Sequence, residues 1–467
     1  MLANSASDTE EQWRVYAQAR LSRDSRFDGR FFVAVKSTGI FCRPICPAKL
    51  PLEKNVEYFE HATQALHHGY RPCLRCRPDS APSSFAWQGV TTTVKRGISL
   101  LSHIPSQPVS HVAERLGISE RYLNKLLQSG LGLSAKQYQS LHRVLFAKQL
   151  LQQTEMTVDD VALSAGYGSS RQLQRAVQQY CKTTPSALRK SVKGNAPTVT
   201  LRLAYLPPYN WPQVRDFLKM RAIEGVEAVS DNSYQRYIRV KGEVGRIKAI
   251  HNAHANGFDI ELRLPSLDGL HSIIEKIKGV LDLHADPQLI KASLHGAGLP
   301  LALIDEGIRV PGTWDVFESG CRAIVGQQVS VKAAIGQASL LAKQLHSPIG
   351  TATCPGFAFP SPQQVASSDV SFLRMPNARK QALISFASLF AQQPSGTTPE
   401  DDAIMAIKGV GQWTLDYIKM RGEKDPDVYL AGDLIVKKMA AKYPVSAEKA
   451  APWRSYLTLQ LWELSKR

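Results

Sequence analysis

The sequence of 467 residues lacks any uninterrupted apolar run of membrane-spanning length. Its opening stretch, MLANSASDTEEQWRVYAQAR, is acidic early and has no apolar core, which argues against a secretory signal. Hydrophobic residues make up 43% of the chain, enough to bury several cores, and the length predicts about three or four domains. These features exclude a membrane-spanning or fibrous protein and predict a soluble, intracellular one.

Acidic residues are under-represented. Asp and Glu number 40 against 57 Lys and Arg, which gives a formal net charge of +17. Such a balance is typical of proteins with a polyanionic partner, although charge can also serve solubility alone. The excess is uneven, because residues 90–194 hold 14 basic and 5 acidic side chains, a net charge of +9. This segment is therefore the first candidate for binding DNA.

Cysteine is scarce, with seven copies that are unevenly placed. Four lie within 35 residues, spaced C-x3-C, 26 residues, C-x2-C: Cys42, Cys46, Cys73 and Cys76. Thiolates bind zinc tetrahedrally, and short cysteine pairs let two loops meet on one ion. We predict that these four bind one Zn2+, against the alternative of four unrelated buried cysteines. The others are interpreted as packing residues: Cys181, Cys321 and Cys354.

Two polar stretches are typical of linkers, RPDSAPSSFAWQG (77–89) and KSVKGNAPT (190–198). Beyond the second, TVTLRLAYL, QRYIRVKG and FDIELRL alternate like strands, and residues 211–223 have helical spacing. From HADPQLIKASL onward the pattern is helical, with Asp286 as a candidate cap and Pro287 at the first helical position. We predict a multidomain, mainly α protein with α+β parts. Its four domains are expected at 1–85, 90–192, 198–284 and 285–467.

The segments VAERLGISERYLNKLLQ (112–128) and VALSAGYGSSRQLQRAVQQY (161–180) share one layout. A small residue, Ala113 or Ala162, is followed four positions later by a glycine. The small residue lets two helices cross closely, and the glycine takes the turn between them. Any helical hairpin could mimic one copy, but two copies offset by 49 residues, each with a basic second helix, indicate an internal duplication. They predict two helix-turn-helix units that bind double-stranded DNA.

Near the C-terminus, AIKGVGQWTLDYIKMR (406–421) places Gly-Val-Gly between two helical stretches. Gly409 and Gly411 would let backbone N–H groups approach a phosphate closely, with a helix N-terminus behind them. About twenty residues later, one carboxylate, Asp433, enters an apolar helical stretch in DVYLAGDLIVKKMA. A Gly-x-Gly string is weak evidence, and a lone Asp there is most often a helix cap. The glycine hairpin and the carboxylate together are stronger evidence for a functional site than either is alone.

The strings FCRP and RPCLRCRP, with all four cysteines, make residues 11–79 similar to the N-terminal domain of the Ada family of methylation-responsive proteins. The resemblance implies that the four cysteines bind zinc and that Cys42 accepts a methyl group from a methylated DNA phosphate. A zinc-bound thiolate stays deprotonated and nucleophilic. Methylation would reduce the charge of the cluster from −2 to −1 and so strengthen DNA binding in a salt-dependent way. The alternative is a zinc site that only holds the domain together.

The string AGYGSSRQLQRAVQQYCKTTPSALR, with Thr-Pro at 184–185, resembles the AraC-type DNA-binding domain. The resemblance implies that two second helices, about 120–128 and 170–180, enter successive major grooves. The exposed candidates for contact with bases or phosphates are Arg121, Asn124, Lys125, Arg171, Gln172 and Arg175.

From about residue 198 to 467 the chain resembles the helix-hairpin-helix DNA glycosylases of the AlkA 3-methyladenine type. The matching strings include PPYNWPQVRDFLKMRAIEGVE, FESGCRAIVGQQVSVKAA, the glycine hairpin, AGDLIVKK and PWRSYLTLQLW. The resemblance implies that Asp433 is catalytic and that Gln328 enters the gap left by a flipped base. It places the base pocket at Phe217, Trp413, Tyr417 and Trp462.

Position 413 bears on the reaction. Glycosylases that also cut the strand carry an amine nucleophile there, whereas this chain has Trp413. This predicts hydrolysis without lyase activity. Lys408 stands where many relatives have proline before Gly-Val-Gly, and no loss of function is expected from it.

The combined prediction is an enzyme of the adaptive response to DNA alkylation. It releases N-alkylated bases of the 3-methyladenine and 7-methylguanine type, senses methyl phosphotriesters and regulates transcription. RNA polymerase is a further candidate partner, and we expect a monomer in the bacterial cytoplasm, at the nucleoid, without a membrane partner. No Pro-Cys-His-Arg string occurs, so the O6-methylguanine methyltransferase half of longer Ada proteins is not expected. The alternatives are a regulator whose glycosylase-like half only grips DNA, and a glycosylase whose N-terminal half only targets it.

Overall fold

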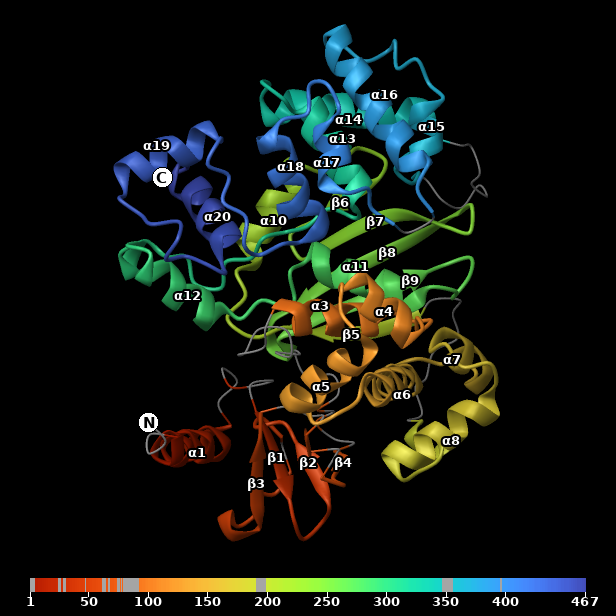
Figure 1. Cartoon of the computed structure of the whole chain (residues 1–467), viewed down its shortest axis with the longest axis vertical. Coiled ribbons are helices and arrows are strands. Elements are labelled where there is room, and N and C mark those ends of the chain that lie inside the picture. The colour runs from red at the N-terminus through yellow and green to blue at the C-terminus, as the bar shows by residue number, and fades with distance from the viewer. Residues whose placement is uncertain are drawn as a thin grey trace. The chain divides into compact units, whose positions relative to one another are not determined.

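The chain folds into two compact units in the computed structural model (Figure 1). Unit 1 comprises Met1–Pro207 with Leu267–Ile274, and unit 2 comprises Pro208–Ser266 with Glu275–Arg467. The structure describes residues 5–23, 27, 31–46, 48–60, 64–65, 68–73, 76, 78, 92–189, 199–346, 356–394 and 397–467.

The first part of unit 1 is a small sheet with one long helix. The helix is α1 (Ser5–Ser22), and the strands, in the order β3-β1-β2-β4, are β1 (Phe32–Val35), β2 (Ile40–Cys42), β3 (Val56–Phe59) and β4 (Arg71–Pro72). Tyr16 of α1 stacks on Phe31 at a centroid distance of 4.2 Å. Strands β2 and β4 are parallel, with Phe41 opposite Pro72. Because Cys42 and Cys73 follow these two residues, this register brings the two cysteine pairs together.

Helices α3 to α9 form the second part of unit 1. Their bounds are α3 (Thr92–Leu101), α4 (Val109–Arg115), α5 (Glu120–Leu131), α6 (Ala135–Gln153), α7 (Val158–Ser164), α8 (Ser170–Cys181) and α9 (Pro185–Leu188). The predicted hairpins are therefore confirmed as α4–α5 and α7–α8. Gly117 and Gly166 take the turns at φ +67° and +73°, where a side chain would be strained.

Serine caps begin the two helices that follow these turns. Ser119 Oγ accepts from the Tyr122 N–H at 3.2 Å, and Ser169 Oγ accepts from the Gln172 N–H at 3.3 Å. Each cap occupies one of the backbone donors that a helix start leaves unpaired. The two second helices bury one leucine-rich face and leave the opposite face exposed, so the basic side chains remain available to a partner.

The sheet of unit 2 is an antiparallel meander in which each strand pairs with the next: β6 (Glu227–Val229), β7 (Ser233–Val240), β8 (Glu243–Asn252) and β9 (Gly257–Arg263). The predicted strands β7 and β9 are confirmed, as is β5 (Val199–Ala204). The alternation argument did not identify β6 or β8. Strand β6 has three residues, and β8 turns the small Gly245 and Ala249 inward beside Ile247, which weakens its apolar signal.

The remainder of unit 2 is helical (Figure 1). Its elements are α10 (Trp211–Met220), α12 (Pro287–Gly296), α13 (Val316–Val325), α14 (Val331–Leu345), α15 (Pro362–Ala366), α16 (Asn377–Ala391), α17 (Asp401–Met405), α18 (Gln412–Ile418), the π-helical turn η7 (Lys419–Glu423), α19 (Leu434–Lys442) and α20 (Arg454–Leu464). Helix α11 (Leu270–Val280) is divided between the units, because its residues up to Ile274 belong to unit 1. Asp286 caps α12 as predicted, with Oδ1 accepting from the Gln288 and Leu289 N–H groups. None of the described helices combines the length and hydropathy that crossing a bilayer requires.

Helix α13 is the centre of unit 2. Gly320 lets it approach α16, because a Cβ at that position would lie 2.0 Å from the Phe386 ring. Its buried residues pack with α14, α16 and α18 in one apolar core. Any shift of α13 would therefore displace the three helices packed against it.

A buried ion network joins α13 to the sheet. The Arg236 guanidinium, 1% exposed, contacts both Glu227 and Glu318, and Arg322 contacts the same two carboxylates. Arg322 also donates to the Arg221 carbonyl at the end of α10, at 2.6 Å. Two positive and two negative charges thus balance in the interior, which limits the desolvation cost.

The pKa of Glu227 is set by its burial and by the two arginines of this network. Burial would raise its pKa, but the charges of Arg322 and Arg236 outweigh burial and lower the pKa to about 2. A depressed folded-state pKa stabilises the fold above the ordinary glutamate value, and this contribution is lost as the pH falls through about 2.

We predict that Glu227→Gln lowers the stability of unit 2 by about 3–5 kcal/mol at pH 7, because it leaves buried arginine charge uncompensated. The deficit relative to wild type should shrink as the pH falls from about 4.5 towards 2. Urea unfolding followed by tryptophan fluorescence measures both, with the exposed Glu224→Gln as the matched control. Equal midpoints for the two variants would refute the structural role of the network.

Candidate metal centre and nucleic-acid sites

The four N-terminal cysteines meet in one cluster. All four Sγ atoms lie within 4.8 Å of one another. Cys42 ends β2, and Cys73 follows β4 with its N–H donating to the Phe41 carbonyl at 2.9 Å. Sulfurs bound to one zinc at about 2.3 Å are about 3.8 Å apart in a tetrahedron. The all-sulfur donor set and its spacing fit one Zn2+, so the predicted metal site is confirmed.

Backbone N–H groups distinguish the four sulfurs. The Ala48 N–H donates to Cys46, the Cys76 N–H donates to Cys73, and the Arg43 N–H donates to Cys76 Sγ at 3.3 Å. In the described part of the chain, no backbone N–H donates to Cys42 Sγ. Cys42 is also half-exposed, whereas Cys46 and Cys73 are each 8% exposed. Cys76 is partly exposed like Cys42 but accepts from the Arg43 N–H, so among the described residues Cys42 combines partial exposure with the lack of a backbone donor.

Most of the predicted helix-turn-helix contacts lie on exposed faces. Arg121 and Lys125 are exposed on α5, and Arg171, Gln172 and Arg175 are exposed on α8. Gln172 Oε1 also accepts from the Gly168 N–H at 3.1 Å, which orients its amide.

Asn124 is placed differently. Its Nδ2 donates to the Glu120 carbonyl at 3.0 Å, and its Oδ1 accepts from the Ala135 N–H at 2.9 Å. Both ends of the amide are thus engaged inside the domain. A structural link between α5 and α6 is what this geometry supports.

The exposed polar face of α8 extends beyond Arg171, Gln172 and Arg175, which the sequence analysis named. Arg175 lines a shallow hollow with Gln174, Gln178, Gln179 and Lys182. These residues recur every three or four positions, which was the signal that they share a helix face. They extend the basic and amide-bearing surface towards the end of the helix.

The glycine hairpin lies between α17 and α18. Gly409 has φ +94°, where a side chain would be strained, and Gly411 is the N-cap of α18. Gln327 ties this hairpin to the loop after α13, because its Nε2 donates to the Gly409 carbonyl at 2.8 Å and to Thr414 Oγ1 at 3.1 Å. The neighbouring Gln328 is exposed at φ +55°. A residue held at the tip of a fixed loop suits insertion into a duplex.

The carboxylate of Asp433 has a fixed orientation. It caps α19, where Oδ1 accepts from the Ile435 N–H at 3.0 Å and from the Val436 N–H at 3.1 Å. The same oxygen accepts from Trp462 Nε1 at 3.1 Å. Among the described residues nothing hydrogen-bonds to Oδ2. One oxygen is therefore anchored, and the other is left for a ligand.

The four predicted aromatic residues gather around this carboxylate. The Phe217 and Trp462 rings are nearly parallel, with centroids 6.4 Å apart, and the Trp413 and Tyr417 rings stack at 5.4 Å. A Cβ on Gly432, next to Asp433, would lie 3.6 Å from Trp413. Trp413, Tyr417 and Trp462 are half-buried, whereas Phe217 is only 1% exposed and forms the floor.

Two arginines that the sequence analysis missed cover Phe217. The guanidinium carbons of Arg221 and Arg421 lie 3.8 and 4.6 Å from the ring centroid. Arg421 Nη1 also donates to the Tyr417 hydroxyl at 3.0 Å. Burial raises the pKa of Tyr417, but the positive charges of Arg421 and Arg221 outweigh it and lower that pKa. The four-residue spacing from Phe217 and Tyr417 was the available signal for both arginines.

We predict that the purified chain carries one zinc ion per molecule and that Cys73→Ser lowers this content well below one. The loss of a thiolate removes one of four ligands from a site whose binding free energy also orders the domain. Metal analysis by mass spectrometry measures it, with Cys181→Ser, a buried cysteine outside the cluster, as the control. Full zinc content in the Cys73 variant would contradict the four-thiolate site.

Three family models match parts of the chain. The metal binding domain of Ada matches residues 15–79, a helix-turn-helix domain matches 112–191, and the AlkA N-terminal domain matches 200–315. The three matches follow one another in the same order as the zinc cluster, the helical hairpins and the meander of unit 2.

One relative matches almost the whole chain, and others match parts of it. The "Probable bifunctional transcriptional activator/DNA repair enzyme AlkA" of Mycobacterium tuberculosis is 34% identical over 94% of both chains. The "DNA-3-methyladenine glycosylase 2" of Escherichia coli is 33% identical and covers 56% of this chain and 95% of its own. The "Bifunctional transcriptional activator/DNA repair enzyme Ada" of Escherichia coli is 31% identical over 37% of this chain and 48% of its own. On this likeness, the chain belongs to the family of bifunctional transcriptional activator/DNA repair enzymes of the Ada and AlkA type.

Proposed function

We propose that this protein releases N-alkylated bases, of the 3-methyladenine and 7-methylguanine type, from DNA by hydrolysis. The observation that carries the proposal is the anchored carboxylate of Asp433, with one free oxygen, among three half-exposed aromatic rings. The same chain would sense methyl phosphotriesters at Cys42 and bind specific DNA sites. Its work would be divided among domains at 1–85, 90–192, 198–284 and 285–467.

Asp433 would act on the sugar of a flipped nucleotide. Breaking the bond between an alkylated base and its sugar leaves positive charge on the sugar, and a fixed carboxylate on that face stabilises it. The three donors on Oδ1 hold the carboxylate in one orientation. Oδ2 is then free to stabilise the charge and to orient the attacking water.

The aromatic rings would hold the flipped base by stacking. Trp413, Tyr417 and Trp462 offer partly open faces, while Phe217 supports them from below. The two arginines over Phe217 add positive charge to the floor, so the charge of a cationic base is not the main attraction. Alkylated purines are instead selected because they leave readily. Trp413 occupies the position of the amine that lyases use, which supports hydrolysis alone.

The hairpin would hold the damaged strand. Backbone N–H groups around Gly409 and Gly411 suit contact with a phosphate. Gln328, at the tip of the adjoining loop, would fill the space that the flipped nucleotide leaves. Because Gln327 bonds to the hairpin, the wedge and the phosphate contact move as one piece.

Cys42 would accept one methyl group from a DNA phosphotriester. When bound, zinc keeps the thiolate deprotonated at neutral pH. A bond forms between Cys42 Sγ and the methyl carbon, the bond from that carbon to the phosphate oxygen breaks, and the phosphate diester leaves with its electron pair. The absence of a backbone donor on this sulfur, within the described residues, supports Cys42 over the other three. With no base to remove the methyl group, the step occurs once per molecule.

The helix-turn-helix pair would give the chain its specific DNA sites. Repressors commonly reach two successive major grooves by forming a dimer, whereas here α5 and α8 belong to one chain. This supports action as a monomer. RNA polymerase would be the partner of a regulator bound in this way.

A regulator with a non-catalytic C-terminal half would need neither an aimed carboxylate nor the aromatic set. We predict that Asp433→Asn reduces base release by at least about a thousandfold, because a neutral amide cannot stabilise the sugar cation. DNA affinity should change less than about threefold. Release of 3-methyladenine from methylated duplex DNA, measured by chromatography, provides the test.

The matched control is Asp286→Asn. Asp286 caps α12 with the same pair of hydrogen bonds that Asp433 makes on α19, at 3.0 and 3.2 Å. It therefore reports the cost of a weakened cap without touching the aromatic cluster. Equal base release by the Asp433 variant and wild type would sink the assignment.

A further inference from the structure

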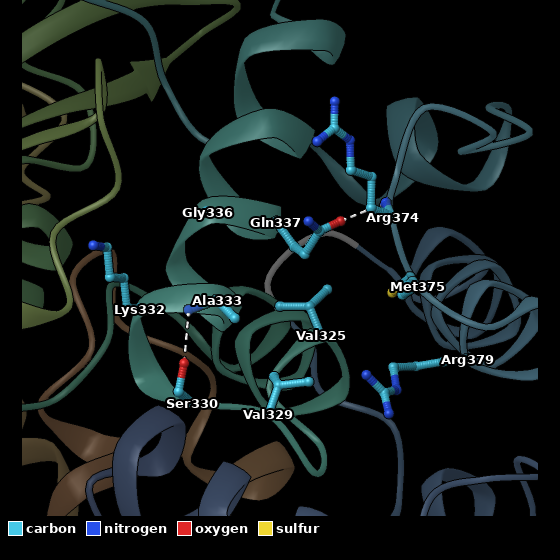
Figure 2. Close-up of a pocket in the computed structure, with 10 residues that line it drawn as sticks. All are labelled: Val325, Val329, Ser330, Lys332, Ala333, Gly336, Gln337, Arg374, Met375 and Arg379. Carbon is cyan, nitrogen blue, oxygen red and sulfur yellow. Dashed lines mark hydrogen bonds between the residues drawn. The ribbon is translucent and has the colours of Figure 1, made fainter.

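A hollow of about 440 Å³ opens beside the loop that carries Gln328 (Figure 2). Its lining comes from the end of α13, the loop, the first turns of α14 and the segment that leads into α16: Val325, Val329, Ser330, Lys332, Ala333, Gly336, Gln337, Arg374, Met375 and Arg379. Nothing in the proposed chemistry of Asp433, the hairpin or the aromatic pocket uses it.

The floor is apolar and unusually open. Val329 is 43% exposed, and Ala333 next to it is exposed as well. The Val331 side chain, at the start of α14, is also exposed, so exposed aliphatic surface continues from the loop into the helix. Aliphatic surface of this kind suits contact with a flat, apolar face of a ligand.

The charged residues that line the hollow are all cationic: Lys332, Arg374 and Arg379. Arg379 extends towards Val325 and Val329, whereas Lys332 and Arg374 extend away from the centre (Figure 2). No carboxylate lines the hollow, and in the part of the chain that the structure describes, none of the three cations pairs with one. Gln337 accepts from the Arg374 N–H at 2.6 Å, which fixes the segment before α16 against α14. An anionic partner is therefore the complementary occupant.

The position of the hollow identifies which anion. The loop after α13 has two sides: Gln327 bonds to the glycine hairpin, and Val329 with Ser330 lines the hollow. Gln328 lies between them. A duplex whose damaged strand rests on the hairpin, with Gln328 in its gap, presents its other strand to the side of the loop away from the hairpin.

We propose that this hollow binds the undamaged strand of the duplex, at the nucleotide left unpaired when its partner is flipped out. The unpaired base lies on the aliphatic floor, Arg379 donates to its edge, and Lys332 and Arg374 contact the flanking phosphates. The inference rests on the proposed glycosylase function and extends it. The enzyme would therefore bind a damaged duplex more tightly than the same damaged single strand, because only the duplex has an undamaged strand to place in the hollow.

A photochemical cross-link tests the placement directly. The full-length, zinc-loaded chain is bound to a duplex with a stable abasic-site analogue, and 4-thiothymidine is placed opposite it. Irradiation, digestion and mass spectrometry should locate the cross-link within residues 325–337 or 374–379. The same probe several nucleotides away should cross-link much less. A cross-link elsewhere on a bound duplex would overturn the inference.

Affinities give a second readout. Arg379→Gln should weaken binding of the abasic duplex about tenfold, because it removes a charged donor to a base edge. Binding of the same damaged single strand should change less than about twofold. Lys332→Gln should lower the salt dependence by about one ion. Lys343→Gln, exposed at the far end of α14, is the control of equal charge change and should leave both affinities within about twofold.

The outcomes separate the two proposals. If base release is intact and Arg379→Gln weakens the binding of duplex and single strand equally, the proposed role of the hollow is wrong and the proposed glycosylase function stands. A chain that neither binds the abasic duplex nor releases alkylated bases would remove both.

Discussion

The proposed reactivity of both anionic centres in this chain depends on backbone N–H groups. In Asp433 they hold one carboxylate oxygen and, with the Trp462 indole, leave the other unoccupied. In the zinc cluster they donate to three sulfurs, and within the described residues they leave the Cys42 sulfur without such a donor. An acceptor that already takes hydrogen bonds is a poorer nucleophile and a poorer partner for new positive charge. Among the described residues, one acceptor atom at each centre is thus left without a hydrogen-bond donor, in a protein that is otherwise strongly basic.

The buried ions of unit 2 place the second centre. Glu227 and Arg236 belong to the sheet, Glu318 and Arg322 belong to α13, and Arg322 also holds the end of α10. Phe217 lies on α10, Trp413 and Tyr417 lie on α18, and α13 packs against α18. The elements that carry these aromatic residues are therefore positioned by α13, through its buried ion pairs with the sheet and its apolar packing against α18. The loop with Gln328 follows α13 directly, so the position of Gln328 also depends on α13.

Much of this could be predicted from sequence, where a local pattern has one physical meaning. The glycines at 117 and 166 mark turns because only glycine takes their φ without strain, and Asp286 with Pro287 marks a helix start. The four cysteines could be assigned from their spacing. What escaped prediction depends on contacts between distant segments. Strand β8 turns Gly245 and Ala249 inward, which hides its alternation. The bonds of Asn124 to Glu120 and Ala135, the cover of Phe217 by Arg421, and the hollow beside α14 need the fold itself.

The central claim is that an acceptor atom left without a hydrogen-bond donor is the reactive one at each centre, and Cys42 offers the sharpest test. The zinc-loaded protein is incubated with DNA that carries methyl phosphotriesters, digested, and the cysteine peptides are weighed. The account predicts one added methyl group, on the peptide containing Cys42 and at that sulfur alone. A methyl group on Cys46, Cys73 or Cys76 would contradict it, because those sulfurs accept backbone hydrogen bonds. An unmodified Cys42 with zinc still bound would reduce the first domain to a structural support for a glycosylase.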